Sequence, residues 1–144
     1  MPSNPKVVVL EDIVRPGDPL VPGGGTRTFQ MSCPVAFTGR RLVIACTDAV
    51  TFESRQLIVR AISHDNNQLI ANGSRGTFNT DLFHPDVGFV GAGSLGFTSI
   101  WARWNEKFSV ADNFSVTLQN FTPGGINVSI YWVTDYGDKC QKCA

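Results

Sequence analysis

The sequence predicts an all-β protein: an antiparallel β-sandwich of the jelly-roll type with an extended N-terminal arm. Two observations lead to this class. Apolar and polar residues alternate along most of the chain while a helical period is almost absent, and Gly and Pro residues interrupt the alternation at short intervals. At 144 residues the chain has the size of one domain that can bury a core without a metal or disulfide bonds. We expect an arm over residues 1–25, a sandwich over 26–137 and a short tail over 138–144.

The predicted arm is rich in Pro and Gly and holds two short apolar stretches. Pro favours extended backbone and cannot complete a ladder of hydrogen bonds, so we predict an arm in which V-V-V-L adds one strand. Two alternatives stay open for this strand: it packs on its own sandwich, or it crosses to a neighbouring subunit and extends a sheet there. In the second case the interface residues of the arm are Val7, Val8, Val9, Leu10, Ile13 and Val14.

The alternating runs place strands at residues 29–37, 40–47, 56–63, 68–71, 96–104, 113–120 and 126–134. The first two runs put Cys33 and Cys46 on apolar faces, and Pro34 indicates a sheet edge or a bulge. The last two runs are joined by F-T-P-G-G and are predicted to form a hairpin. Between residues 73 and 96 we expect long loops with one short helix over 79–83.

The charge of the chain argues against some classes of partner. It has 12 basic and 12 acidic side chains, so it offers no long-range field that would steer nucleic acid to it. No apolar run approaches the roughly 20 residues of a membrane span, and the first residues lack the basic and apolar regions of a secretory signal. We expect neither nucleic acid nor a membrane as partner, and synthesis in the cytoplasm. The redox state of the four Cys stays open.

The chain closes with K-C-Q-K-C-A, in which Cys140 and Cys143 have the spacing of a zinc knuckle or a redox motif. Zinc would need Cys33 and Cys46 as further ligands, but both fall within apolar strand faces. The Cys pair of a redox motif normally lies at the N-terminus of a helix, and no such helix is expected here. We therefore predict no metal and no cofactor, and keep a small zinc-binding module with Cys140 and Cys143 as ligands as an alternative. A tail disulfide, a crosslink to another chain and free thiols stay open.

The two histidines, His64 and His84, each have an Asp nearby. Catalysis would need an activated nucleophile, and no serine lies in an elbow motif. These histidines have the side chains needed to bind a metal together with Asp65, Asp81 and Asp86. However, Asp in such segments more often accepts hydrogen bonds from the local backbone in turns. We assign no catalytic residue and expect that the protein is not an enzyme.

The stretch I-W-A-R-W places Trp101 and Arg103 on the face opposite to Trp104. We expect Trp104 in the core and Trp101 with Arg103 at an interface, since Trp and Arg are favoured at binding hot spots. An exposed Trp on a β-sandwich can also stack on a sugar ring. The alternative function is therefore a carbohydrate-binding or receptor-binding module that uses Trp101 with loop aromatics such as Phe89 and Phe97.

The order of these features resembles one group of proteins. A Pro/Gly arm is followed by F-x-G-x-R-L-V-I in F-T-G-R-R-L-V-I (37–44), then by L-I-V-R-A-I-S, an N-x-Q-L segment and a closing Gly-rich hairpin. Over most of residues 26–136 this pattern of strands is similar to small β-sandwich virion proteins of bacteriophages, of the capsid cement or decoration type, and to single jelly-roll capsid proteins. The Cys-x-x-Cys tail departs from it.

The resemblance implies a non-enzymatic structural protein of the virion. Such a protein forms a homo-oligomer, often a trimer, and stabilises the phage head through contacts between subunits. Its partners would be its own copies and the major capsid protein or other virion proteins. The resemblance carries over no catalytic residues.

Overall fold

The computed structural model describes residues 6–71, 80–83 and 104–134, and residues 1–5, 72–79, 84–103 and 135–144 lie outside the described part. In the described residues every regular element is a strand except one short 3₁₀ helix, which confirms the all-β prediction. None of these residues belongs to a helix long and apolar enough to cross a membrane. The elements are β1 (Val7–Leu10), β2 (Leu20–Val21), β3 (Thr26–Ser32), β4 (Phe37–Gly39), β5 (Arg41–Asp48), β6 (Ile58–His64), β7 (Asn67–Ala71), η1 (Thr80–Phe83), β8 (Glu106–Phe108), β9 (Asn113–Gln119) and β10 (Ile126–Val133).

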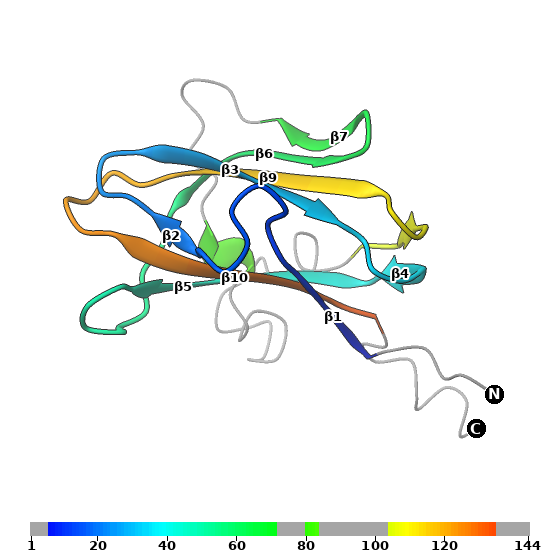
Figure 1. Ribbon diagram of the computed structural model, residues 1–144, viewed down its shortest axis with the longest axis horizontal. Helices are drawn as coiled ribbons and strands as arrows, with labels where there is room; N and C mark the ends of the chain where they lie inside the picture. The colour runs from blue at the N-terminus through cyan, green and yellow to red at the C-terminus, as the bar shows by residue number, and fades with distance from the viewer. Residues whose placement is uncertain (1–5, 72–79, 84–103, 135–144) are drawn as a thin grey trace, which may run out of the picture.

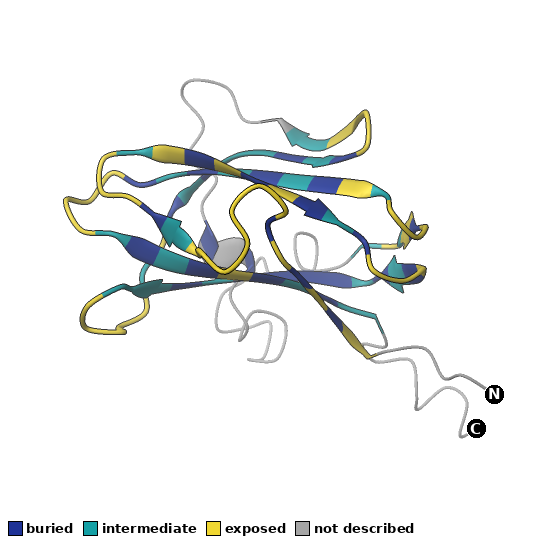
Figure 2. Cartoon of the chain, viewed as in Figure 1, coloured by how far each residue is buried: buried dark blue, intermediate teal, exposed yellow. Residues whose placement is uncertain are grey.

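The strands form two four-stranded antiparallel sheets and a two-stranded ribbon of β4 and β8. Figure 1 shows the two larger sheets as stacked layers, with β3, β6, β7 and β9 in one and β1, β2, β5 and β10 in the other. Buried and exposed residues alternate along the strands (Figure 2), as they do in β3 and β10. The alternation follows from the strand geometry, because successive side chains point to opposite faces and only one face meets the other sheet.

In the first sheet β10 is the central strand. β5 pairs with the whole length of β10 on one side, while β1 and β2 share the other side. Between them residues 11–19, the strap, leave the sheet and lie against β3, where the Ile13 amide donates to the Gln30 carbonyl at 2.8 Å. The strand V-V-V-L therefore packs on its own sandwich, which is the first of the two alternatives.

The second sheet has the order β3, β9, β6, β7. β3 lies at its edge, as Pro34 suggested, but the predicted strand over 29–37 is wrong in its second half. The strand ends at Ser32, because Pro34 has no amide hydrogen for a ladder, and the chain leaves the sheet. Val35 is 40% exposed, and Phe37 begins the separate strand β4.

The core lies between the two sheets and is centred on Trp132. Its side chain is fully buried, and its ring contacts those of Trp104, Phe108 and Phe114 at centroid distances between 5.4 and 5.5 Å. Trp104, expected in the core, thus packs against it. Cys33 and Cys46 are both buried in the same core, which confirms the faces predicted for them.

The predicted hairpin over 113–134 is wrong. β9 and β10 alternate as expected, but β9 pairs with β3 and β6 in the second sheet, while β10 belongs to the first. The connection over residues 120–125 therefore crosses from one layer to the other. Alternation cannot distinguish these arrangements, because two strands bury their apolar faces equally well side by side or face to face.

Asn120 holds this crossing in place. Its side chain is fully buried, and its amide nitrogen donates to the Val21 carbonyl at 3.2 Å and to the Gly124 carbonyl at 2.8 Å. Its side-chain oxygen accepts from the Thr122 amide at 2.9 Å. Its hydrogen bonds satisfy backbone groups that would otherwise be buried without partners.

Candidate functional site

The residues expected to carry function fall into two groups. Trp101, Arg103, His84, Cys140 and Cys143 lie outside the described residues, as do Phe89 and Phe97. The apolar residues of the first 25 positions are described, and they divide between core and surface.

Val8 and Leu10 were expected at an interface, but they are core residues of the chain's own sandwich. They point inward because β1 pairs with β10, and alternation then turns every second side chain to the core. Val7, Val9, Ile13 and Val14 stay exposed, between 46% and 68%. These four residues are named here the strap surface.

The strap covers a cleft of about 470 Å³ between itself, β3 and β10. The floor of the cleft is apolar, with Phe29, Met31, Val128 and Ile130, but each of these side chains is buried. A ligand would therefore find little apolar surface there to bind.

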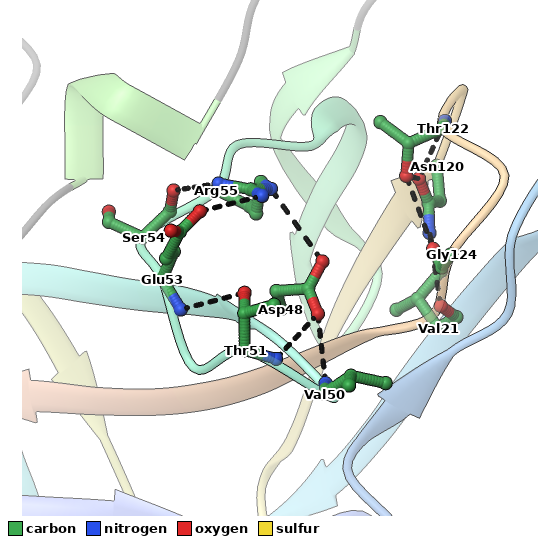
Figure 3. Close-up of polar contacts among 10 residues, drawn as sticks. All are labelled: Val21, Asp48, Val50, Thr51, Glu53, Ser54, Arg55, Asn120, Thr122 and Gly124. Atoms are coloured by element: carbon green, nitrogen blue, oxygen red, sulfur yellow. Dashed lines mark hydrogen bonds and ion pairs between the residues drawn. The ribbon is translucent and has the colours of Figure 1, made fainter.

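At one end of the sandwich, the loops over 48–55 and 120–125 (Figure 3) carry further exposed apolar side chains. The two loops are joined by a hydrogen bond from the Ala49 amide to the Gly125 carbonyl at 3.1 Å. Between them they expose Val50 at 82%, Phe52 at 72% and Phe121 at 67%. We call these three side chains the loop-end surface.

The loop that carries Val50 and Phe52 is held by its own hydrogen bonds. The Asp48 carboxylate accepts from the amides of Val50 at 2.8 Å and Thr51 at 3.0 Å, and these bonds keep the pKa of Asp48 below its ordinary value. The Phe52 amide donates to the Asp48 carbonyl at 2.9 Å, with Phe52 at a φ of 62°. A bulky residue rarely adopts this left-handed conformation, and such strain is retained where the surrounding structure imposes it.

The third feature is a cluster of titratable side chains at the opposite end of the sandwich. His64 closes β6 and is nine-tenths buried, and its two ring nitrogens face two carboxylates. Nδ1 lies 2.7 Å from Oε2 of Glu106, which opens β8, and Nε2 lies 2.8 Å from Oδ2 of Asp112, in the turn before β9. Oδ2 of Asp65 lies 3.7 Å from the same Nε2.

These contacts change the titration of the cluster. Burial opposes the charged form of His64, but hydrogen bonds to Glu106 and Asp112 outweigh it, so the pKa of His64 is raised. The Ser109 amide and His64 together hold the pKa of Asp112 below its ordinary value. Burial, with the charges of Asp112 and Asp65, raises the pKa of the Cys33 thiol to about 11. That thiol stays protonated at neutral pH and is a poor nucleophile.

The cluster partly matches the sequence expectations. His64 and Asp65 were singled out as possible metal ligands, and the fold brings Asp112 to them, so that ligand atoms of the three lie within 4.8 Å of one another. A metal would have to open the hydrogen bond between His64 and Asp112. Glu106 and Asp112 were not predicted, because they lie 42 and 48 residues from His64 and no local pattern marks them.

Comparison with known proteins adds no relative. No protein-family model matches the chain, and neither the curated proteins nor the solved structures include a significant match. Function must therefore be argued from the surfaces and clusters described above.

Proposed function

We propose that this chain is a non-enzymatic structural protein of a virion, a capsid cement or decoration protein or a capsid subunit, which acts by associating with its own copies and with the major capsid protein. The observation that carries the proposal is the loop-end surface. Exposed apolar side chains scattered singly need no explanation, but here three large ones lie on two loops that a backbone hydrogen bond joins.

The strained backbone conformation of Phe52 supports this interpretation. A flexible loop could fold its aromatic ring onto the protein, whereas this loop is tied at Asp48 and keeps Phe52 in solvent with a strained backbone. An apolar side chain presented in this way loses little conformational entropy on binding, which favours association. Aromatic residues are also enriched at protein interfaces.

The strand order supports the jelly-roll part of the proposal. In chain order, β1 and β2 lie in the first layer, β3 in the second, β5 in the first, β6, β7 and β9 in the second, and β10 in the first. The two sheets have the orders β1/β2, β10, β5 and β3, β9, β6, β7, and this distribution of consecutive strands over two layers supports the proposed jelly roll.

Association of such subunits would combine several small contacts. A specific interface buries about 1,200 to 2,000 Å² in total, more than the loop-end surface alone can supply. The strap surface offers a second apolar contact on another part of the molecule. Weak contacts repeated around a closed ring or shell give a high overall stability.

The proposal is tested by measuring the oligomeric state of the purified protein by native mass spectrometry over a range of concentrations. We expect a closed homo-oligomer, with a trimer favoured, and its loss in the double variant Phe52→Ser with Phe121→Ser. Val110→Ser is the matched control, because Val110 is 63% exposed but lies in the turn between β8 and β9, outside these two loops. If the protein is monomeric at every concentration and binds sugars, the carbohydrate-binding alternative is favoured. If the double variant still forms the oligomer, the role of the loop-end surface is refuted.

A further inference from the structure

Three segments far apart in the sequence meet at His64. The residue itself ends β6, Glu106 begins β8, and Asp112 closes the turn over 109–112 that leads into β9. The turn is also tied to the end of β3, since the Cys33 amide donates to the Asp112 carbonyl and the Ala111 amide donates to the Cys33 carbonyl, both at 2.9 Å. One imidazole ring therefore joins the second sheet to the ribbon strand β8 by a hydrogen bond.

We propose that His64 is a proton-operated latch, which in its protonated form holds β8 and the 109–112 turn against the second sheet and on losing its proton releases this end of the sandwich. The inference concerns the single chain and does not depend on the proposed function.

The hydrogen-bond chemistry of the ring requires the proton. An ionised carboxylate can only accept hydrogen bonds, and a neutral imidazole carries only one N–H. Both contacts, at 2.7 and 2.8 Å, are therefore satisfied only when both ring nitrogens are protonated. After deprotonation, one ring nitrogen would present its lone pair to a carboxylate at hydrogen-bond distance, and that contact would become repulsive.

The charged groups around His64 all favour the protonated form of its ring. Glu106 faces it from β8, Asp112 from the following turn and Asp65 from its own turn, and the Cys33 thiol beyond them is neutral. In the described part of the chain no Lys or Arg pairs with these three carboxylates. The strand neighbours of His64, Asn67 and Phe114, carry no charge. The imidazolium is thus the positive charge that these acids share.

The ring contacts of Phe108 next to His64 show which apolar side chains the release of the latch would expose. The Phe108 ring stacks on the His64 ring with centroids 4.0 Å apart, and on Phe37 at 4.7 Å, and it also touches Trp132. β8 is only three residues long and pairs with a strand equally short. A ribbon of this length has little stability of its own, so it depends on side-chain contacts such as those of His64 and Phe108.

The direction of the switch follows from the titration. Because the pKa of His64 is raised in the folded state, the stabilisation by the latch is complete below the ordinary pKa of histidine and is lost as the pH rises through the raised value. Because the pKa of Asp112 is lowered, the contact of Asp112 with His64 is lost only as the pH falls below the ordinary pKa of aspartate. The latch is therefore closed at moderately acidic pH and opens toward alkaline pH.

The test is amide hydrogen exchange by NMR across a pH series in EDTA, read as protection factors for the amides of Cys33, Ser109 and Ala111, together with the chemical shifts of the His64 ring. We expect protection of these amides to fall about tenfold per pH unit through the range in which His64 deprotonates. The amides of β10 in the centre of the sandwich should stay protected.

Variants separate the latch from other titrations. His64→Gln should show low protection at this end at every pH, while His84→Gln should leave the transition unchanged. Glu106→Gln should move the midpoint to lower pH, and Glu53→Gln, at the other end of the molecule, should not. If His64→Gln does not fold, the shift in Glu106→Gln still decides. Protection that does not depend on pH, or a transition that persists in His64→Gln or keeps its midpoint in Glu106→Gln, would overturn the proposal.

Discussion

The Arg27 guanidinium donates a hydrogen bond to the Asp12 carboxylate at 2.8 Å, in a place where the two side chains are 2% and 4% exposed. This pair fastens the strap to β3. Arg27 also donates to the Leu20 carbonyl at 2.7 Å and lies 4.2 Å from the centre of the Phe29 ring. A single arginine thus ties the segment between β1 and β2 to the body of the sandwich.

Removal of one partner of this pair should be strongly destabilising. We expect Asp12→Ala to lower the free energy of unfolding by about 3 to 5 kcal/mol, because Arg27 would be left buried without its carboxylate. Urea unfolding followed by tryptophan fluorescence measures this change. Asp18→Ala is the control: Asp18 lies 3.6 Å from Arg27 but is 45% exposed, so its loss should cost about 1 kcal/mol or less. Equal effects of the two substitutions would contradict the assignment.

The same pair should shape the acid unfolding of the protein. Burial opposes ionisation of Asp12, but hydrogen bonds from Arg27 and from the Val14 amide leave its pKa below the ordinary value. A lowered folded-state pKa gives stability that is present above the unfolded pKa and is lost as the pH falls through the folded one. We expect Asp12→Asn to be less stable at neutral pH and to lose less stability than wild type on acidification. Equilibrium unfolding at a series of pH values compares the two slopes.

Gly39 should tolerate no side chain. An added Cβ would lie 2.5 Å from Cε3 of Trp132, a fully buried ring that cannot move without disturbing its aromatic neighbours. We expect Gly39→Ala to cost about 1 to 3 kcal/mol through overpacking. Gly124→Ala is the matched control, since an added Cβ there meets nothing within 4 Å. Thermal unfolding of both variants checks the contrast, and an unchanged midpoint for Gly39→Ala would show that the approach of β4 to Trp132 is looser than described.

Asn120→Asp should be destabilising in a pH-dependent manner. The substitution replaces the amide nitrogen, which donates to two carbonyls, by an oxygen that cannot donate when ionised. Burial against carbonyl oxygens would raise the pKa of the new carboxyl, so we expect the penalty to shrink as the pH falls and the carboxyl is protonated. Unfolding of wild type and variant at pH 4 and pH 7 measures the difference, and a penalty equal at both values would count against the crossing contacts of Asn120.

Leu10→Ala tests whether β1 belongs to its own sandwich. Leu10 is buried in the core while its neighbour Val9 is 68% exposed, so we expect Leu10→Ala to cost about 2 to 5 kcal/mol and Val9→Ala much less. The loss should not depend on protein concentration, because the strand pairs with β10 of the same chain. A destabilisation that grows on dilution would show that β1 crosses to another subunit in solution.

Local patterns were enough to predict the strands and the inward faces of many of their residues. Alternation located β5, β6, β9 and β10 and placed Cys33 and Cys46 in the core, because a strand between two sheets must turn every second side chain inward. It also predicted that V-V-V-L forms a strand, while leaving open which sheet that strand extends.

The sequence by itself therefore determined the fold class, since the period of the apolar residues is a property of neighbouring positions. Only the tertiary structure decided that β9 and β10 lie in different sheets and that Arg27 meets Asp12. The same is true of the contacts of His64 with Glu106 and Asp112, more than 40 residues away. The physical reason is that burial of an apolar face is non-directional and satisfied by many pairings, whereas a hydrogen bond between distant side chains exists only after one pairing has been chosen.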